Sequence, residues 1–171
     1  MCNGINNALG RTITEKVFID AIYSINNISS VSDKRCIYLH GEPGVGKTNF
    51  VYDILNDLDY DIIRYTITDI KNKDMNDILY NNGVSKQSIK GMFTKTNRKN
   101  IIVIDDNLSP DTMEKHILSS FIKLVRPKKN KRQIATEKCI SFPIVCICNS
   151  SIDKYTRPLM DASICIHLPK P

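Results

Sequence analysis

No apolar run in this sequence approaches the roughly 18 residues that a membrane-spanning helix requires. Residues 1–10 lack the apolar stretch of a signal peptide, and Cys2 stands where N-myristoylation requires glycine. No internal repeat and no Gly/Ser-rich linker divides the chain, so its 171 residues predict one domain of ordinary size. A content of 42% hydrophobic and 25% charged residues excludes disorder over the whole length. We therefore expect a globular protein without a membrane partner.

The sequence also lacks the cysteine spacing of a metal site. Six cysteines are present, but none forms a C-x-x-C pair, and the three histidines are scattered. Four of the cysteines lie in apolar runs that are typical of strands: Cys36, Cys146, Cys148 and Cys165. We interpret them as small buried hydrophobic residues of a protein in a reducing intracellular compartment. A metal site is the alternative, which this spacing disfavours.

One stretch carries the whole net charge of +6. Residues 121–138 contain seven lysines and arginines against the single acid Glu137, and the rest of the chain is neutral. Such a distribution indicates a local contact with a polyanion such as a nucleic-acid backbone, and a solvated loop is the alternative. Segment 123–132 contains no aromatic residue, so base stacking is not expected there. The candidate DNA contacts are Lys128, Lys129, Lys131 and Arg132.

The apolar pattern predicts an alternation of short strands and helices. Five apolar runs are typical of strands: 36–40, 61–67, 100–106, 142–150 and 164–168. The spacing of apolar residues predicts helices at 13–27, 47–58, 111–125 and 155–162. Strands that are apolar throughout are buried on both faces. The sequence therefore predicts an α/β fold, a parallel sheet with helices on both sides.

Residues 41–48 match the phosphate-loop pattern G-x-x-x-x-G-K-[ST] between a predicted strand and a predicted amphipathic helix. Glycines let backbone N–H groups curl around phosphate oxygens, and the helix N-terminus adds partial positive charge. In such a loop Lys47 contacts the β- and γ-phosphates, and Thr48 binds Mg²⁺. The expected nucleotide-binding residues are Gly41, Glu42, Pro43, Gly44, Val45, Gly46, Lys47 and Thr48.

Two other predicted strands end in polar residues, at the edge of the sheet where the phosphate loop is expected. Asp105 and Asp106 end one strand, and Asn149 ends another. We expect Asp105 to hold Mg²⁺ and Asp106 to orient or deprotonate the attacking water. The Asn149 amide can hydrogen-bond the γ-phosphate or the water. The candidate catalytic residues are Lys47, Asp105, Asp106 and Asn149.

Together these motifs resemble those of the AAA+ ATPases, and more narrowly those of the large subunit of replication factor C, the clamp loader. The family's first strand, phosphate loop, helix and second strand are similar to KRCIYLHGEPGVGKTNFVYDILNDLDYDIIRYTITD. Its Walker B strand is similar to IIVIDDN, and its sensor 1 strand and following stretch are similar to FPIVCICNSS and TRPLMDASICIHLPKP. The resemblance covers most of residues 35–170.

The resemblance implies a P-loop NTPase three-layer sandwich with five parallel strands in the order 5-1-4-3-2. It implies ATP and Mg²⁺ as cofactors, and ATP hydrolysis in DNA replication or repair. The implied partners are other clamp-loader AAA+ subunits and a sliding clamp, at a nuclear or cytoplasmic replication site, that of a virus included. Residues 1–34 then form an N-terminal helix and loop, and 35–171 form an AAA+ core that ends where the family's helical lid begins.

Departures from the family pattern bear on the rate of hydrolysis. Asp106 stands where the family usually has Glu, and its carboxylate lies roughly an ångström further from the water, so slow hydrolysis is expected. Residues 161–163 read Asp-Ala-Ser, without the arginine finger of the small subunits, which the large subunits lack too. We also expect no lid and collar beyond Pro171, and the N-terminal region lacks the family's Tyr-Arg-Pro signature.

Two other functions remain open. A P-loop nucleoside or nucleotide kinase has a similar size, although the tandem aspartates and Asn149 suit water activation more than transfer to a bound acceptor. An ATP-binding interaction subunit with little hydrolysis would agree with Asp106. Phosphate release without an added acceptor distinguishes an ATPase from a kinase.

Overall fold

The structure is a computed structural model of the chain, and it describes residues 6, 8–27, 34–66, 98–105, 119, 121–122, 125, 143–149 and 157–170. Three helices have defined bounds within these residues: α2 (Thr12–Asn26), α3 (Lys47–Asp57) and α9 (Arg157–Ala162). The strands are β1 (Cys36–His40), β2 (Asp61–Tyr65), β3 (Asn100–Asp105), β4 (Ile144–Cys148) and β5 (Ile164–His167). These elements confirm the corresponding predictions with small shifts at their ends. Among the described helices, none is long and apolar enough to cross a lipid bilayer.

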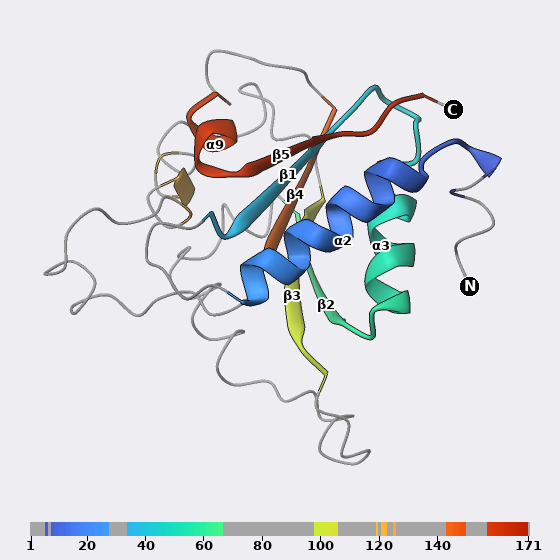
Figure 1. Cartoon of the computed structure of the whole chain (residues 1–171). Helices are drawn as coiled ribbons and strands as arrows, with labels where there is room; N and C mark the ends of the chain where they lie inside the picture. Colours follow the sequence, from blue (N-terminus) through green and yellow to red (C-terminus); the bar gives the residue numbers. More distant parts are fainter. Residues whose placement is uncertain are drawn as a thin grey trace, which may run out of the picture.

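All five strands form one parallel sheet in the order β2-β3-β4-β1-β5 (Figure 1). This is the expected order 5-1-4-3-2 read from the other edge, and it confirms the predicted P-loop NTPase fold. In the central strands, His40 is in register with Cys148, and Asp105 is in register with Ile147. The carboxyl ends of β1, β3 and β4 therefore lie side by side in the middle of the sheet.

Helices α2 and α3 pack together on one face of the sheet (Figure 1). Phe18 of α2 and Phe50 of α3 meet edge to face, with ring centroids 5.8 Å apart. Both belong to one apolar cluster with strand residues such as Ile37 and Val145. Val17 of α2 points away from this cluster and is 47% exposed. Phe18, one residue further and about 100° around the helix, is buried instead.

The opposite face of the sheet is covered by α9 and by Phe121 and Val125. Both of these side chains are buried, and most of the predicted helix 111–125 lies outside the described residues. They share a second apolar cluster with Leu159 of α9 and Tyr38 of β1. Helices on both faces confirm the three-layer arrangement.

Three of the four cysteines predicted to be buried are buried, but Cys165 is exposed. Its strand, β5, lies at the edge of the sheet and has alternating exposure, which an apolar run in the sequence does not reveal. Cys36 and Cys146 lie on adjacent strands with their Sγ atoms 3.6 Å apart. Burial, and then the hydrogen bond with Cys36, raise the pKa of the Cys146 thiol well above its usual range. This thiol therefore stays neutral in the core.

Candidate nucleotide-binding site

Residues 41–46 form the turn between β1 and α3, and two of their glycines have left-handed backbone conformations. Gly44 has a φ of 78° and Gly46, the N-cap of α3, has a φ of 83°. Residues with a Cβ rarely adopt these values. A Cβ at either position would meet no atom within 4 Å. Glycine is therefore required by the backbone conformation and not by a lack of space. The turn therefore leaves open space at the N-terminus of α3, where anions bind favourably.

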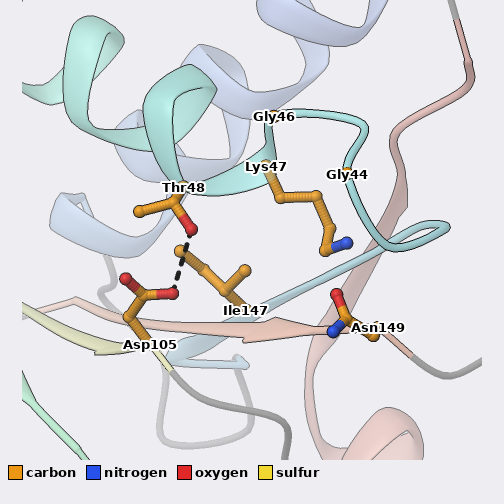
Figure 2. A pocket seen from close by; sticks show the side chains of 7 residues that line it. All are labelled: Gly44, Gly46, Lys47, Thr48, Asp105, Ile147 and Asn149. Atoms are coloured by element: carbon orange, nitrogen blue, oxygen red, sulfur yellow. Dashed lines mark hydrogen bonds between the residues drawn. The ribbon is translucent and has the colours of Figure 1, made fainter.

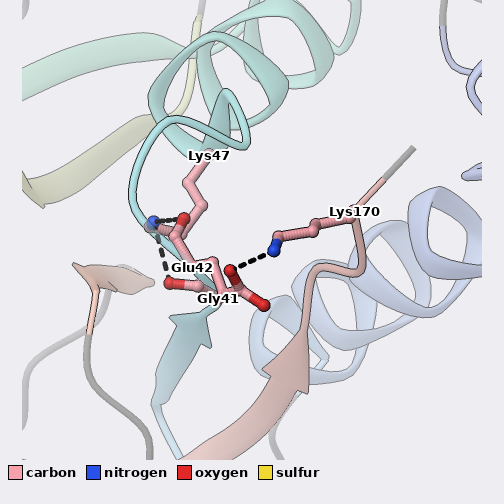
Figure 3. Close-up of polar contacts among 4 residues, drawn as sticks. All are labelled: Gly41, Glu42, Lys47 and Lys170. Atoms are coloured by element: carbon pink, nitrogen blue, oxygen red, sulfur yellow. Dashed lines mark hydrogen bonds and ion pairs between the residues drawn. The ribbon is translucent and has the colours of Figure 1, made fainter.

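Gly41 is required for a different reason, the close approach of the segment that follows β5. A Cβ at Gly41 would lie 2.6 Å from the carbonyl oxygen of Leu168. The Leu168 N–H donates to the His40 carbonyl over 2.8 Å, which holds this segment against the end of β1. Lys170 in the same segment forms an ion pair with Glu42 (Figure 3). The C-terminal segment thus fixes the start of the loop.

Lys47 begins α3, and its side chain turns back beneath the loop (Figure 3). Its Nζ donates to the carbonyl oxygens of Gly41 at 3.0 Å and Glu42 at 2.7 Å. Lys47 is buried, and burial lowers the pKa of its ammonium group, while Cys148 and then Asp105 act in the opposite direction. The loop therefore encloses a cation whose position is fixed by the loop's own carbonyls.

The hydroxyl of Thr48 and the carboxylate of Asp105 meet across the site. Thr48 Oγ1, in the first turn of α3, donates to Asp105 Oδ1, at the end of β3, over 3.0 Å (Figure 2). Arg64 of β2 approaches the other carboxylate oxygen, with its Nη2 3.1 Å from Asp105 Oδ2. The Arg64 side chain is 57% exposed and that of Asp105 only 11%. A largely buried carboxylate is thus held between a hydroxyl and a solvent-accessible guanidinium.

Lys47, Thr48 and Asp105 line a cavity of about 340 Å³. Its lining residues come from the loop, α3, β3 and β4 (Figure 2): Gly44, Gly46, Lys47, Thr48, Asp105, Ile147 and Asn149. Asn149 follows β4, which lies between β1 and β3, so the strand order brings its amide to the cavity. The structure thus brings together Lys47, Thr48, Asp105 and Asn149, and their chemical roles stay predictions.

The donor atoms around the cavity suit a nucleoside triphosphate with Mg²⁺. Hydroxyl and carboxylate oxygens are ligands that Mg²⁺ prefers, and two ligands at about 2.1 Å from one octahedral ion lie about 3 Å apart. Thr48 Oγ1 and Asp105 Oδ1 have this separation, at 3.0 Å. Lys47 and the N-terminus of α3 provide positive charge for phosphate groups. The residues present therefore fit both groups.

Sequence analysis misses two side chains at the site. Arg11 immediately precedes α2 and is 3% exposed, and its Nη2 donates to the carbonyls of Val45 at 2.8 Å and Pro169 at 3.4 Å. No local pattern marks Arg11, because its partners are 34 and 158 positions away. Arg64 is the second, and its only signal is a basic residue between apolar residues of a strand.

Some of the other predicted residues belong to the phosphate loop but do not line the cavity. Glu42 and Pro43 are exposed in the turn, and Val45 is buried beneath it. The residues outside the described part are Asp106, Lys128, Lys129, Lys131 and Arg132. Their assigned roles stay predictions.

Comparison with known proteins identifies the class to which this fold and site belong. Residues 37–169 match the model of the ATPase family associated with various cellular activities (AAA). This match covers most of the chain and includes the phosphate loop, Asp105 and Asn149. The chain therefore belongs to the AAA family of ATPases.

The proteins with similar sequences include two replication factor C large subunits and a chromosome transmission fidelity protein. The chain is 29% identical over 128 residues to the replication factor C large subunit of Methanococcus maripaludis, covering 74% of this chain and 24% of that protein. It is 25% identical over 139 residues to the large subunit of Pyrobaculum aerophilum, covering 81% and 29%. It is 27% identical over 141 residues to the chromosome transmission fidelity protein 18 homolog of Drosophila melanogaster, covering 80% and 14%. The chain thus spans less than a third of the length of these relatives.

Proposed function

We propose that the chain is an ATP-binding and ATP-hydrolysing subunit of clamp-loader type that acts in DNA replication or repair. The observation that carries the proposal is the cavity at the carboxyl ends of β3 and β4, where Lys47, Thr48, Asp105 and Asn149 meet beside the phosphate loop. Membership of the AAA family supports the ATPase part, and the similarity to replication factor C large subunits supports the clamp-loader part.

When bound, ATP with Mg²⁺ supplies a phosphoryl group whose charge the metal partly neutralises. We assign phosphate binding to the backbone N–H groups of residues 41–48 and to Lys47. An ammonium group has three N–H donors, and two of those of Lys47 already bond to loop carbonyls. The third remains for a phosphate oxygen. Thr48 and Asp105 are the proposed ligands of Mg²⁺.

Hydrolysis also requires a group that activates water, and we assign this role to Asp106, the residue after Asp105. The Asn149 amide lines the same cavity, which supports our assignment of Asn149 as the residue that orients the water or the γ-phosphate. An aspartate at position 106 is one methylene shorter than the glutamate that the resemblance implies, so the water is held less closely. We infer that the isolated chain hydrolyses ATP slowly.

The proposed partners are other clamp-loader AAA+ subunits, a sliding clamp and the DNA backbone, which segment 123–132 would contact. We also propose that 35–171 is the AAA+ core, with 1–34 as a helix and loop attached to it. Packing of α2 supports this attachment, because its Phe18 lies in the same apolar cluster as Phe50 of α3. The N-terminal helix would then move as one unit with the phosphate loop.

Affinity purification from the native source tests the clamp-loader assignment. Tagged full chain is purified in the presence of ATP and Mg²⁺, beside the phosphate-loop variant Lys47→Ala and the exposed control Lys16→Ala on α2. We expect small clamp-loader subunits and a sliding clamp to copurify with the wild type and the control, and less with Lys47→Ala. Absence of both partners from a wild-type chain that binds ATP would contradict the clamp-loader assignment.

A further inference from the structure

Arg11, at the start of α2, donates a hydrogen bond to the backbone of the phosphate loop on the side away from the cavity. Its backbone is fixed at both ends, because its N–H donates to Asn6 O at 2.7 Å and its carbonyl accepts from Glu15 N at 2.9 Å. Further along the helix, Phe18 anchors α2 in the core. From this position the guanidinium Nη2 donates to the Val45 carbonyl over 2.8 Å.

The bond to Val45 determines the orientation of one loop peptide. In a trans peptide the carbonyl of one residue and the N–H of the next point in opposite directions, and the described residues contain no cis peptide. Because Arg11 holds the Val45 carbonyl, the Gly46 N–H points away from Arg11. Gly46 lines the cavity, and its own carbonyl is occupied by Phe50 N at 2.9 Å. Arg11 thus fixes a donor at the N-terminus of α3.

The charge of Arg11 has no carboxylate partner among the described residues. Its guanidinium contacts backbone carbonyls there, and its buried Nε has no hydrogen-bond partner in that part of the chain. A buried cation that is paired only with dipoles is costly to the fold. An anion on the cavity side of the loop would offset this cost, because Coulomb attraction acts strongly where water is excluded.

We propose that Arg11 is a positioning residue for nucleotide binding, which orients the Val45–Gly46 peptide toward bound phosphate and places a buried positive charge behind the loop. The inference rests on the proposed ATP site and adds a residue from outside the phosphate-loop pattern. It predicts that Arg11, at the start of α2, acts on the nucleotide site although it lies outside 35–171.

The test compares three variants of the full chain: Arg11→Met, Arg11→Lys and the control Lys16→Met. Arg11→Met keeps most of the length of the side chain without charge or donors, and Lys16→Met removes one exposed positive charge from the same helix. ATP and ADP affinities are measured by calorimetry. The Gly46 amide resonance is followed by ¹⁵N NMR without nucleotide, and folding is checked by urea denaturation.

We expect Arg11→Met to weaken ATP binding about tenfold, as for loss of one hydrogen bond to a charged group, and to shift the Gly46 resonance. Arg11→Lys should recover part of the affinity, and Lys16→Met should match the wild type in both measurements. Wild-type ATP affinity in Arg11→Met would overturn the inference. If Arg11→Met does not fold, wild-type ATP affinity together with an unshifted Gly46 resonance in Arg11→Lys would overturn it. Failure of the wild type to bind ATP would instead overturn the proposed function.

Discussion

Thr48 Oγ1 and Asp105 Oδ1 lie 3.0 Å apart although 57 positions separate these residues in the sequence. The distance follows from the strand order, because β4 alone separates β3 from β1, which leads into the phosphate loop and α3. Thr48 is in the first turn of that helix, and Asp105 is the last residue of β3. The fold thus brings the two proposed Mg²⁺ ligands together from distant parts of the sequence.

Arg64 should compete with Mg²⁺ for Asp105, because a guanidinium and a metal ion are attracted to the same carboxylate. We predict that Arg64→Gln lowers the Mg²⁺ concentration needed for half-maximal ATP binding. The effect should be at most about fivefold, since Arg64 is largely exposed and water screens exposed ion pairs. Calorimetric ATP titrations at several Mg²⁺ concentrations measure it. Arg64→Lys keeps the charge and should behave like the wild type, and a higher Mg²⁺ requirement for Arg64→Gln would contradict the prediction.

Substitutions at Asp106 test the proposed role of its carboxylate in hydrolysis. We predict that Asp106→Glu preserves or raises the rate, because the longer side chain reaches further toward the water, and that Asp106→Asn abolishes hydrolysis, because an amide cannot accept the proton. Phosphate release from ATP without an added acceptor measures both rates. If Asp106→Asn hydrolyses ATP as fast as the wild type, another group activates the water.

The phosphate loop is predictable from sequence because its conformation depends on local glycines and on the strand and helix beside it. The gathering of Asp105 and Asn149 at that loop depends on the order of the strands, which the family resemblance supplied. Arg11 and Arg64 were not predictable in the same way, since long side chains select partners only after the tertiary structure has brought them within reach. The burial of Cys165 was predicted wrongly for a related reason, because an apolar run does not show which strand lies at the edge.

Salt dependence tests the proposed DNA contact of segment 123–132. A contact with the phosphate backbone should be nearly independent of DNA sequence and should weaken steeply with salt. We predict that replacement of Lys128, Lys129, Lys131 and Arg132 by Ser weakens binding to all DNA sequences alike. The log–log salt slope should become shallower by about 0.9 for each DNA phosphate that the variant no longer neutralises. Fluorescence anisotropy at two salt concentrations measures both, and curves identical to those of the wild type would identify a solvated loop.

His40 should make the stability of the fold depend on pH. Burial, and then the charge of the neighbouring His167, lower the pKa of His40, whose ring also lies 6.0 Å from that of Tyr38. The unfolded chain therefore binds more protons at this site below about pH 6.5, and stability is lost as the pH falls through that value toward the lower pKa of the folded state. We predict that His40→Gln reduces this loss. Urea denaturation between pH 5 and 8 measures it, and parallel curves for variant and wild type would show that His40 does not contribute.

The central claim is that the loop between β1 and α3 binds ATP with Mg²⁺ through Lys47. The most direct test is a calorimetric titration of the full chain with ATP, carried out once in the presence of Mg²⁺ and once in EDTA without Mg²⁺. The wild type, Lys47→Ala and Lys16→Ala are compared. We predict that Mg²⁺ strengthens binding to the wild type and that Lys47→Ala weakens it by about tenfold or more, because a buried charged donor to phosphate is lost. The exposed control should bind like the wild type. Equal ATP affinities for Lys47→Ala and the wild type would contradict the claim.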